Sequence, residues 1–76
     1  MANILAQRIE ETLRPVVGTV LASVSVDLES KRIGKTPDTI DRDDLSTIAD
    51  NLTEQLRLVV GAELATAASQ KVRDLA

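Results

Sequence analysis

The chain has 76 residues, with nine basic and twelve acidic side chains that leave a net charge of −3. It contains no Cys, His, Phe, Tyr or Trp, which excludes disulfides, thiolate and imidazole metal ligands, and the commonest nucleophiles and general bases of catalysis. We therefore expect a non-enzyme without catalytic residues, cofactor or metal, folded as one small domain over residues 1–76.

A core made only of Leu, Ile, Val and Ala buries less area per residue than one containing aromatic side chains. Small chains without disulfides or metals often gain stability by associating with another copy. No run of about 18 apolar residues is present, and the N-terminus lacks the charged-then-apolar order of a signal peptide. These features predict a cytoplasmic protein, and the acidic balance disfavours nucleic acid as a partner.

The first half is predicted to be helical because its apolar residues recur at steps of three and four, from Leu5 to Leu28. Pro15 leaves two alternatives. One long helix runs from about 3 to 33 with a kink near residues 11 to 15, or a short helix ends near Thr12 and a second begins at Pro15. The apolar phase is unbroken across the proline, which favours the kinked helix.

The segment 34–41 is predicted to be a connecting loop. Gly34 suits a left-handed cap at the end of the first helix, and Asp41 suits the N-cap of the next. Ile40 and Leu45 have the spacing of a hydrophobic staple around that cap. A connection this short turns the chain back on itself.

The second half is predicted to form one helix from about 42 to 75, because its apolar phase continues through Gly61. The fold class is therefore all-α, an antiparallel hairpin of two long helices. Each helix of about 30 residues would be about 45 Å long. Two such hairpins are expected to pair into a four-helix bundle.

An internal repeat relates the two halves. Residues 13–22 and 56–65 are identical at seven of ten positions at an offset of 43. The domain is thus interpreted as two units, about 4–33 and 47–76, joined by the loop at 34–41.

Each unit contains a Gly-x-x-x-Ala pair, which places two small residues on one helix face. We expect these pairs to oppose each other where the helices cross, so that a larger side chain at either glycine would overpack the crossing. Adjacent apolar residues widen the face beyond one seam, which predicts a homodimer or larger assembly. The expected crossing and interface residues are Gly18, Ala22, Gly61, Ala65, Val17, Val20, Leu21, Val60 and Leu64.

Two charged groups admit a functional and a structural interpretation. The aspartates at 38, 41, 43 and 44 offer carboxylates for a cation, but their spacing does not match a calcium loop and helix capping explains them more simply. Arg14 and Arg57 occupy equivalent positions and suggest an anion site, whereas pairing with acidic residues one turn earlier is the commoner role.

The stretch from Gly34 to Leu45 resembles the connection into the last helix of histone-fold proteins. That resemblance implies a histone-like dimer that binds nucleic acid, although the longer second helix and the negative charge depart from the family, and no residue role is carried over. The residues themselves favour a homo-oligomeric helical interaction module, with a regulatory or scaffolding role and itself or another protein as partner. A small enzyme or ligand carrier is the least favoured class.

Overall fold

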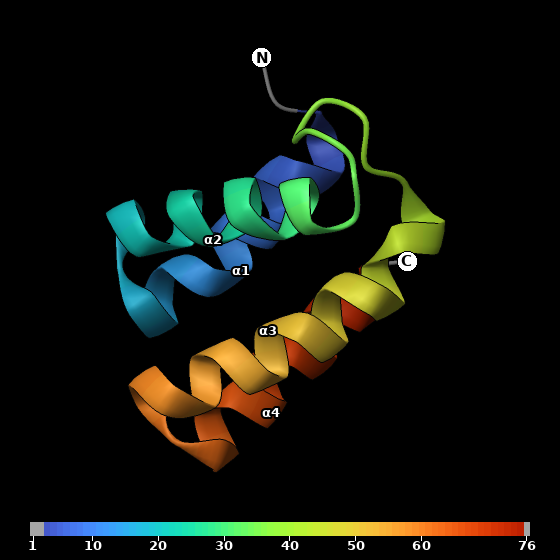
Figure 1. Ribbon diagram of the computed structural model, residues 1–76. Helices are drawn as coiled ribbons and strands as arrows, with labels where there is room; N and C mark the ends of the chain where they lie inside the picture. The colour runs from blue at the N-terminus through green and yellow to red at the C-terminus, as the bar shows by residue number, and fades with distance from the viewer. Residues whose placement is uncertain (1–2, 76) are drawn as a thin grey trace.

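The computed structural model describes residues 3–75, and within that range the chain forms four α-helices and one short 3₁₀ helix (Figure 1). Their order is α1 Ile4–Val17, α2 Thr19–Arg32, η1 Arg42–Asp44, α3 Leu45–Val60 and α4 Ala62–Arg73. The all-α class is confirmed. The expected domain also includes residues 1, 2 and 76, which lie outside the described residues.

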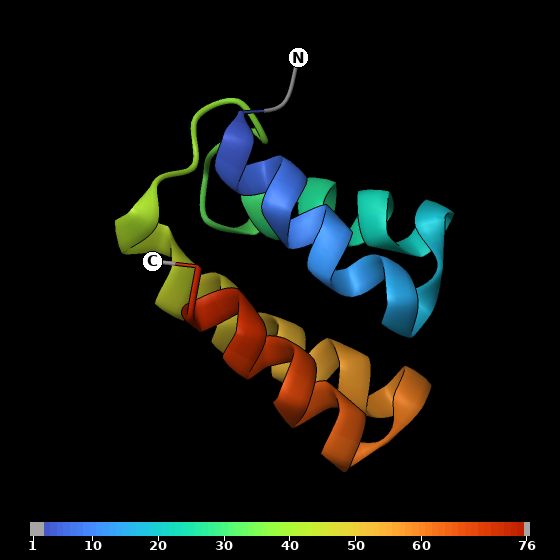
Figure 2. The same cartoon turned by 180° about the vertical axis from the view of Figure 1, so that it is seen from behind.

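The four helices form two hairpins, one from α1 and α2 and one from α3 and α4, where two long helices were expected (Figures 1 and 2). The molecule measures 29 × 22 × 19 Å, too short for helices of 45 Å. Helix α1 continues through Pro15 and ends at Val17. The chain therefore breaks at Gly18, and not before Pro15 as either alternative proposed.

Each hairpin turns at a single glycine, and the two turns have the same backbone geometry. Gly18 has φ 88° and ψ 166°, and Gly61 has φ 89° and ψ 167°. This combination is accessible essentially only to glycine, because a Cβ of an L-residue would clash with the backbone. One residue of this kind ends a helix and reverses the chain, which is why the expected continuous helix from 42 to 75 is two helices.

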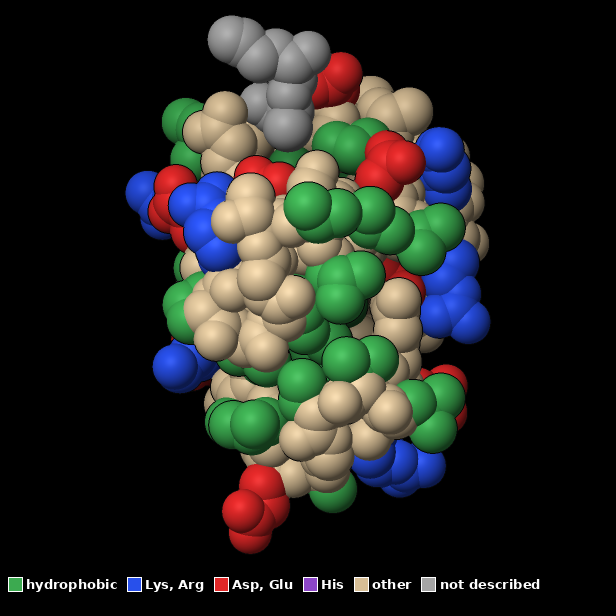
Figure 3. Space-filling view, turned by 90° about the vertical axis from the view of Figure 1, so that its left-hand side faces the viewer, with side chains coloured by type: hydrophobic (Ala, Val, Ile, Leu, Met, Phe, Trp, Pro, Cys, Tyr) green, Lys and Arg blue, Asp and Glu red, His purple; other side chains and the backbone are tan. Residues whose placement is uncertain are grey.

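The glycines also satisfy the backbone on both sides of the turn. Gly18 N–H donates to the carbonyl of Arg14 at 2.9 Å, and its own carbonyl accepts from Ala22 N–H at 3.0 Å. Gly61 makes the equivalent bonds to Arg57 and Ala65. Both turns lie at the same end of the molecule, which Figure 3 views directly.

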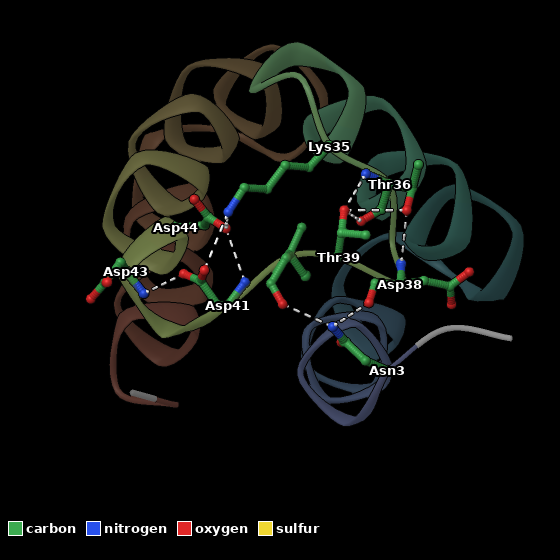
Figure 4. Close-up of polar contacts among 9 residues, drawn as sticks. Asn3, Lys35, Thr36, Asp38, Thr39, Asp41, Asp43 and Asp44 are labelled. Atoms are coloured by element: carbon green, nitrogen blue, oxygen red, sulfur yellow. Dashed lines mark hydrogen bonds and ion pairs between the residues drawn. The ribbon is translucent and has the colours of Figure 1, made fainter.

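The loop between the hairpins is capped at both ends as the sequence predicted. Gly34 has φ 76°, and Gly34 and Lys35 donate to the carbonyls of Lys31 and Ser30, the paired bonds of a Schellman motif. Asp41 accepts from Asp43 N–H. The Asp44 carboxylate accepts in return from Asp41 N–H, which completes a capping box (Figure 4).

Two side chains fasten this loop to its surroundings (Figure 4). Lys35 Nζ lies 2.7 Å from the Asp44 carboxylate and 3.2 Å from that of Asp41. Asn3 caps α1 by accepting from Ala6 N–H and donates to the Ile40 carbonyl, each at 2.8 Å. The start of α1 is thereby held against the loop that leads into the second hairpin.

One hydrophobic core runs through both hairpins, so a single chain already supplies four packed helices. Ala22 and Ala65, one turn after the glycines, are fully buried, and their small size lets the two helices of each hairpin approach closely. The buried apolar residues are Ala6, Ile9, Leu13, Ala22, Val26, Ile40, Leu45, Ile48, Ala49, Leu52, Leu56, Ala65, Ala68 and Val72.

Candidate interaction surface

Helix α2 presents apolar side chains on its outer face. Val20, Leu21, Val24 and Leu28 are 75, 48, 44 and 46% exposed. Because each residue of an α-helix advances by about 100°, these four fall within an arc of roughly 100°. Positions 21, 24 and 28 also have the three-and-four spacing of a coiled-coil seam.

The inner face of α2 is polar by comparison. Ser25, Glu29 and Ser30 are at most 5% exposed, and they share that buried side with Ala22 and Val26. The Ser30 hydroxyl donates to the Val26 carbonyl at 2.7 Å, which satisfies it within the helix. The usual distribution of an amphipathic surface helix, apolar inward and polar outward, is therefore reversed on much of α2.

Helix α4 provides an internal comparison at the offset of 43 residues. Its positions equivalent to Val20, Val24 and Leu28 carry Glu63, Ala67 and Lys71. At these three positions α4 is polar or small where α2 is branched and apolar, whereas Leu21 and its equivalent Leu64 are exposed leucines in both helices. Two helices in matching places of the two hairpins differ in this face, so the architecture alone does not require an apolar exterior on α2.

The charge beside this face is balanced. Lys31 Nζ lies 3.2 Å from the Asp27 carboxylate, and both side chains are about half exposed or more. A surface of this kind can meet an identical surface without like charges being brought together.

Further apolar side chains are exposed near the second turn. Leu58, Val59 and Leu64 flank Gly61 and are 88, 59 and 54% exposed. Figure 3 shows hydrophobic side chains spread across the end of the molecule that carries both turns. Contiguous exposed apolar surface on a small protein often marks an interaction site.

The expected interface residues occupy three kinds of place. Gly18 and Gly61 form the turns and not a helix crossing, and a Cβ added at either would meet no atom within 4 Å, so overpacking is not the effect of a larger residue there. Ala22 and Ala65 are in the core, and Val17 and Val60 are half-buried against it. Val20, Leu21 and Leu64 are exposed.

Sequence reasoning did not assign Val24, Leu28, Leu58 or Val59 to the surface, because the apolar period was interpreted as core. The signal that separates them lies in the differences between the two halves. Where one half carries Leu28 and the other Lys71, the shared scaffold does not need an apolar residue at that position.

Three of the charged side chains singled out in the sequence, Asp41, Asp44 and Arg14, have local partners. Asp41 and Asp44 cap the helix and bind Lys35, and Arg14 lies 3.7 Å from Glu10 on the same helix. Within residues 3–75, no three His, Cys, Asp or Glu side chains are grouped as metal ligands.

The basic group that nucleic-acid binding would use is also paired. Lys31, Arg32 and Lys35 each have a carboxylate oxygen within 3.4 Å, from Asp27, Glu29 and Asp44 respectively. Their charge is locally neutralised, which leaves no basic ridge in this part of the molecule.

No protein-family model matches this sequence, and neither the curated proteins nor the solved structures contain a match to it. Among the described helices, none combines the length and the apolar character needed to cross a bilayer.

Proposed function

We infer that this protein is a small helical interaction module, regulatory or scaffolding in role, that pairs with a second copy of itself through the outer face of α2. The observation that carries this proposal is the reversed polarity of α2, with Val20, Leu21, Val24 and Leu28 outside and Glu29 inside. Exposing branched apolar side chains costs free energy that burial against a partner recovers. We also propose that the protein acts in the cytoplasm, the location expected from the sequence.

A second copy is the occupant that fits the surface best. The exposed apolar residues span positions 20–28 of α2, the adjacent charges of Asp27 and Lys31 neutralise each other, and a twofold arrangement would place identical apolar rows together. A stable interface buries about 800 Å² on each partner. The exposed residues beside the turns extend the available area beyond α2.

The test is sedimentation equilibrium of the full chain, with the mass compared with the 8.2 kDa monomer. We expect a dimer for the parent protein at micromolar concentration. The double substitution Val20→Glu and Val24→Ala gives α2 the residues found at the matching positions of α4, and it should yield a monomer with an unchanged helical circular dichroism spectrum.

Ile4→Glu is the matched control. Ile4 is 67% exposed at the start of α1, away from the turns, and a carboxylate there is favoured by the helix dipole. This variant should remain dimeric. A monomeric parent, or equal masses for the parent and the α2 double variant, would refute self-pairing through this face.

A further inference from the structure

A groove runs between α2 of the first hairpin and α3 of the second. One part, a cleft of about 210 Å³, is lined by Leu28, Glu29, Arg32 and Gln55. A second part of about 270 Å³ is lined by Glu54 and Leu58 together with the same Arg32 and Gln55. Because both parts share two residues, they form one groove of mixed apolar and acidic character.

Two of the residues that line the groove each have a buried side-chain oxygen without a hydrogen-bond donor. Glu29 is 1% exposed, and while its Oε2 lies 3.4 Å from Arg32 Nη1, its Oε1 has no partner. Gln55 Oε1 is likewise buried and unpaired. Within residues 3–75, Ser69 Oγ is the only other buried side-chain atom in this state. Such atoms are rare in folded proteins, because burial removes their hydrogen bonds to water without supplying a replacement.

The scaffold does not require either acceptor. At the offset of 43 residues, Glu29 corresponds to Val72 on α4, and Gln55 corresponds to Thr12 on α1. Val72 is fully buried, and the Thr12 hydroxyl donates to the Arg8 carbonyl at 2.8 Å. At the equivalent positions, α4 therefore carries a valine and α1 a threonine that is hydrogen-bonded within its own helix, where α2 and α3 carry a carboxylate and an amide.

We propose that the groove between α2 and α3 binds a primary ammonium group carried on an aliphatic chain. An ammonium has three donors and no acceptor, which complements the free oxygens of Glu29 and Gln55. Glu29 and Glu54 outweigh the single guanidinium of Arg32, so the groove favours a cation.

The apolar walls select the rest of the ligand. Leu28 and Leu58 line the two parts of the groove, and they can contact the methylene stem of an alkylammonium while its head reaches the acceptors. Each part, at about 210 and 270 Å³, is smaller than the 300–1,000 Å³ of typical small-molecule pockets, which suits one side chain or a slender amine. A lysine on a protein partner and a free polyamine present the same chemistry.

The proposal goes beyond self-pairing. Leu28 belongs to both surfaces, but neither Val20 nor Val24 lines the groove, so the pairing face can be altered there without changing the groove. The Val20→Glu, Val24→Ala variant should therefore bind alkylammonium as the parent does, even when it is monomeric. This result separates failure of one proposal from failure of the other.

The binding experiment is a titration of the ¹⁵N-labelled full chain with n-butylammonium chloride at constant ionic strength, followed by the side-chain amide signals of Gln55. We expect saturable shifts with n-butylammonium and none with 1-butanol or tetramethylammonium, which lack the charge or the N–H donors. Glu29→Gln and Glu29→Val should each weaken binding by about tenfold or more. Equal shifts with tetramethylammonium, or no saturable shift with n-butylammonium, would overturn the proposal.

Two further arms identify the source and test the unpaired state of Glu29. The first arm compares the affinities of spermidine and of a helical peptide with one lysine, with the same peptide carrying acetyl-lysine as the control. Tighter binding of spermidine identifies a free polyamine as the ligand, and tighter binding of the lysine peptide identifies a protein partner. In the absence of ligand, Glu29→Val should leave the thermal midpoint unchanged or raise it, because it removes a buried carboxylate. A midpoint lower by several degrees would show that Glu29 stabilises the fold, and would overturn the proposal.

Discussion

The backbone geometry of the glycine turns predicts that L-alanine and D-alanine have opposite effects on stability at these positions. This result would distinguish the observed fold from a hairpin of two long helices. At φ 88° and ψ 166°, Gly18 occupies a region that an L-residue enters at a cost of about 1–3 kcal/mol. Replacing glycine also restricts the unfolded chain, which offsets about 0.4–1 kcal/mol. Gly18→Ala should therefore destabilise the protein by about 1–2 kcal/mol.

D-alanine at the same position should have the opposite effect. Its allowed backbone regions are the mirror image of those of L-alanine, and the mirror of the Gly18 geometry falls in the broad extended region. Gly18 is exposed, so the added methyl is not forced into the core. We expect D-alanine to stabilise the protein by about 0.4–1 kcal/mol through the unfolded state alone.

The two peptides have the same mass and composition, and a chain of 76 residues is accessible to chemical synthesis. Thermal unfolding followed by circular dichroism compares them directly. For a domain of this size, 1 kcal/mol corresponds to about 4–8 °C, so L-alanine should lower the midpoint by about 5–15 °C and D-alanine should raise it by a few degrees. The same pair at Gly61 should behave alike, because its φ and ψ are the same within a degree.

The opposite order of midpoints would refute the turn. In a continuous helix, L-alanine is more stable than glycine by about 1 kcal/mol, and a D-residue is disfavoured by a similar amount. The sign of the difference between the two alanines therefore distinguishes the architectures without any need for its exact size.

Two further predictions concern the loop between the hairpins. Asn3→Ala should lower the unfolding free energy by about 1–2 kcal/mol, since it removes the cap on Ala6 N–H and the donor to the Ile40 carbonyl. Asn3→Asp keeps the capping oxygen and loses the donor, so in chemical denaturation it should recover part of that loss. Equal stability of the parent and the alanine variant would contradict the role of Asn3. The Asp44 carboxylate raises the pKa of Lys35 above 10.5, and Lys35 lowers the pKa of Asp44 below 3.8. The stability that the pair contributes should therefore be complete between these values and be lost as the pH falls below 3.8 or rises above 10.5. The measurement is the difference in thermal midpoint between the parent and Lys35→Met as a function of pH. If that difference does not change with pH, the pair contributes nothing to stability.

The local features of this fold could be predicted from the sequence. The cap at Gly34, the N-cap at Asp41 and the buried pair of Ile40 and Leu45 are confirmed, because each depends on residues within a few positions of one another. The all-α class followed from the apolar period for the same reason. Interactions of this range leave their signature in residue type and spacing.

The reversal of each half at its glycine could not be predicted in the same way. The apolar period continues through Gly18 and Gly61, and a glycine in mid-helix costs only about 1 kcal/mol. What decides the turn is tertiary: the reversal buries Ala22 against the first helix and Ala65 against the third, and this packing has no local signature. The near-identity of the two ten-residue copies was informative, because it placed both turns and both alanines at equivalent positions.

The candidate sites escaped prediction because α2 departs from the rule on which sequence analysis depends. An apolar arc is assigned to the core, yet Leu21, Val24 and Leu28 face outward while Glu29 is enclosed. A sequence shaped only for folding stability would place these residues the other way round, as α4 does with Lys71 outside and Val72 inside. Conflicts between local pattern and global fold are uncommon in natural chains, and they concentrate where function imposes a second demand. Two such conflicts on one helix support both proposals, an outer face for an apolar partner and a groove for a hydrogen-bond donor, which meet at Leu28.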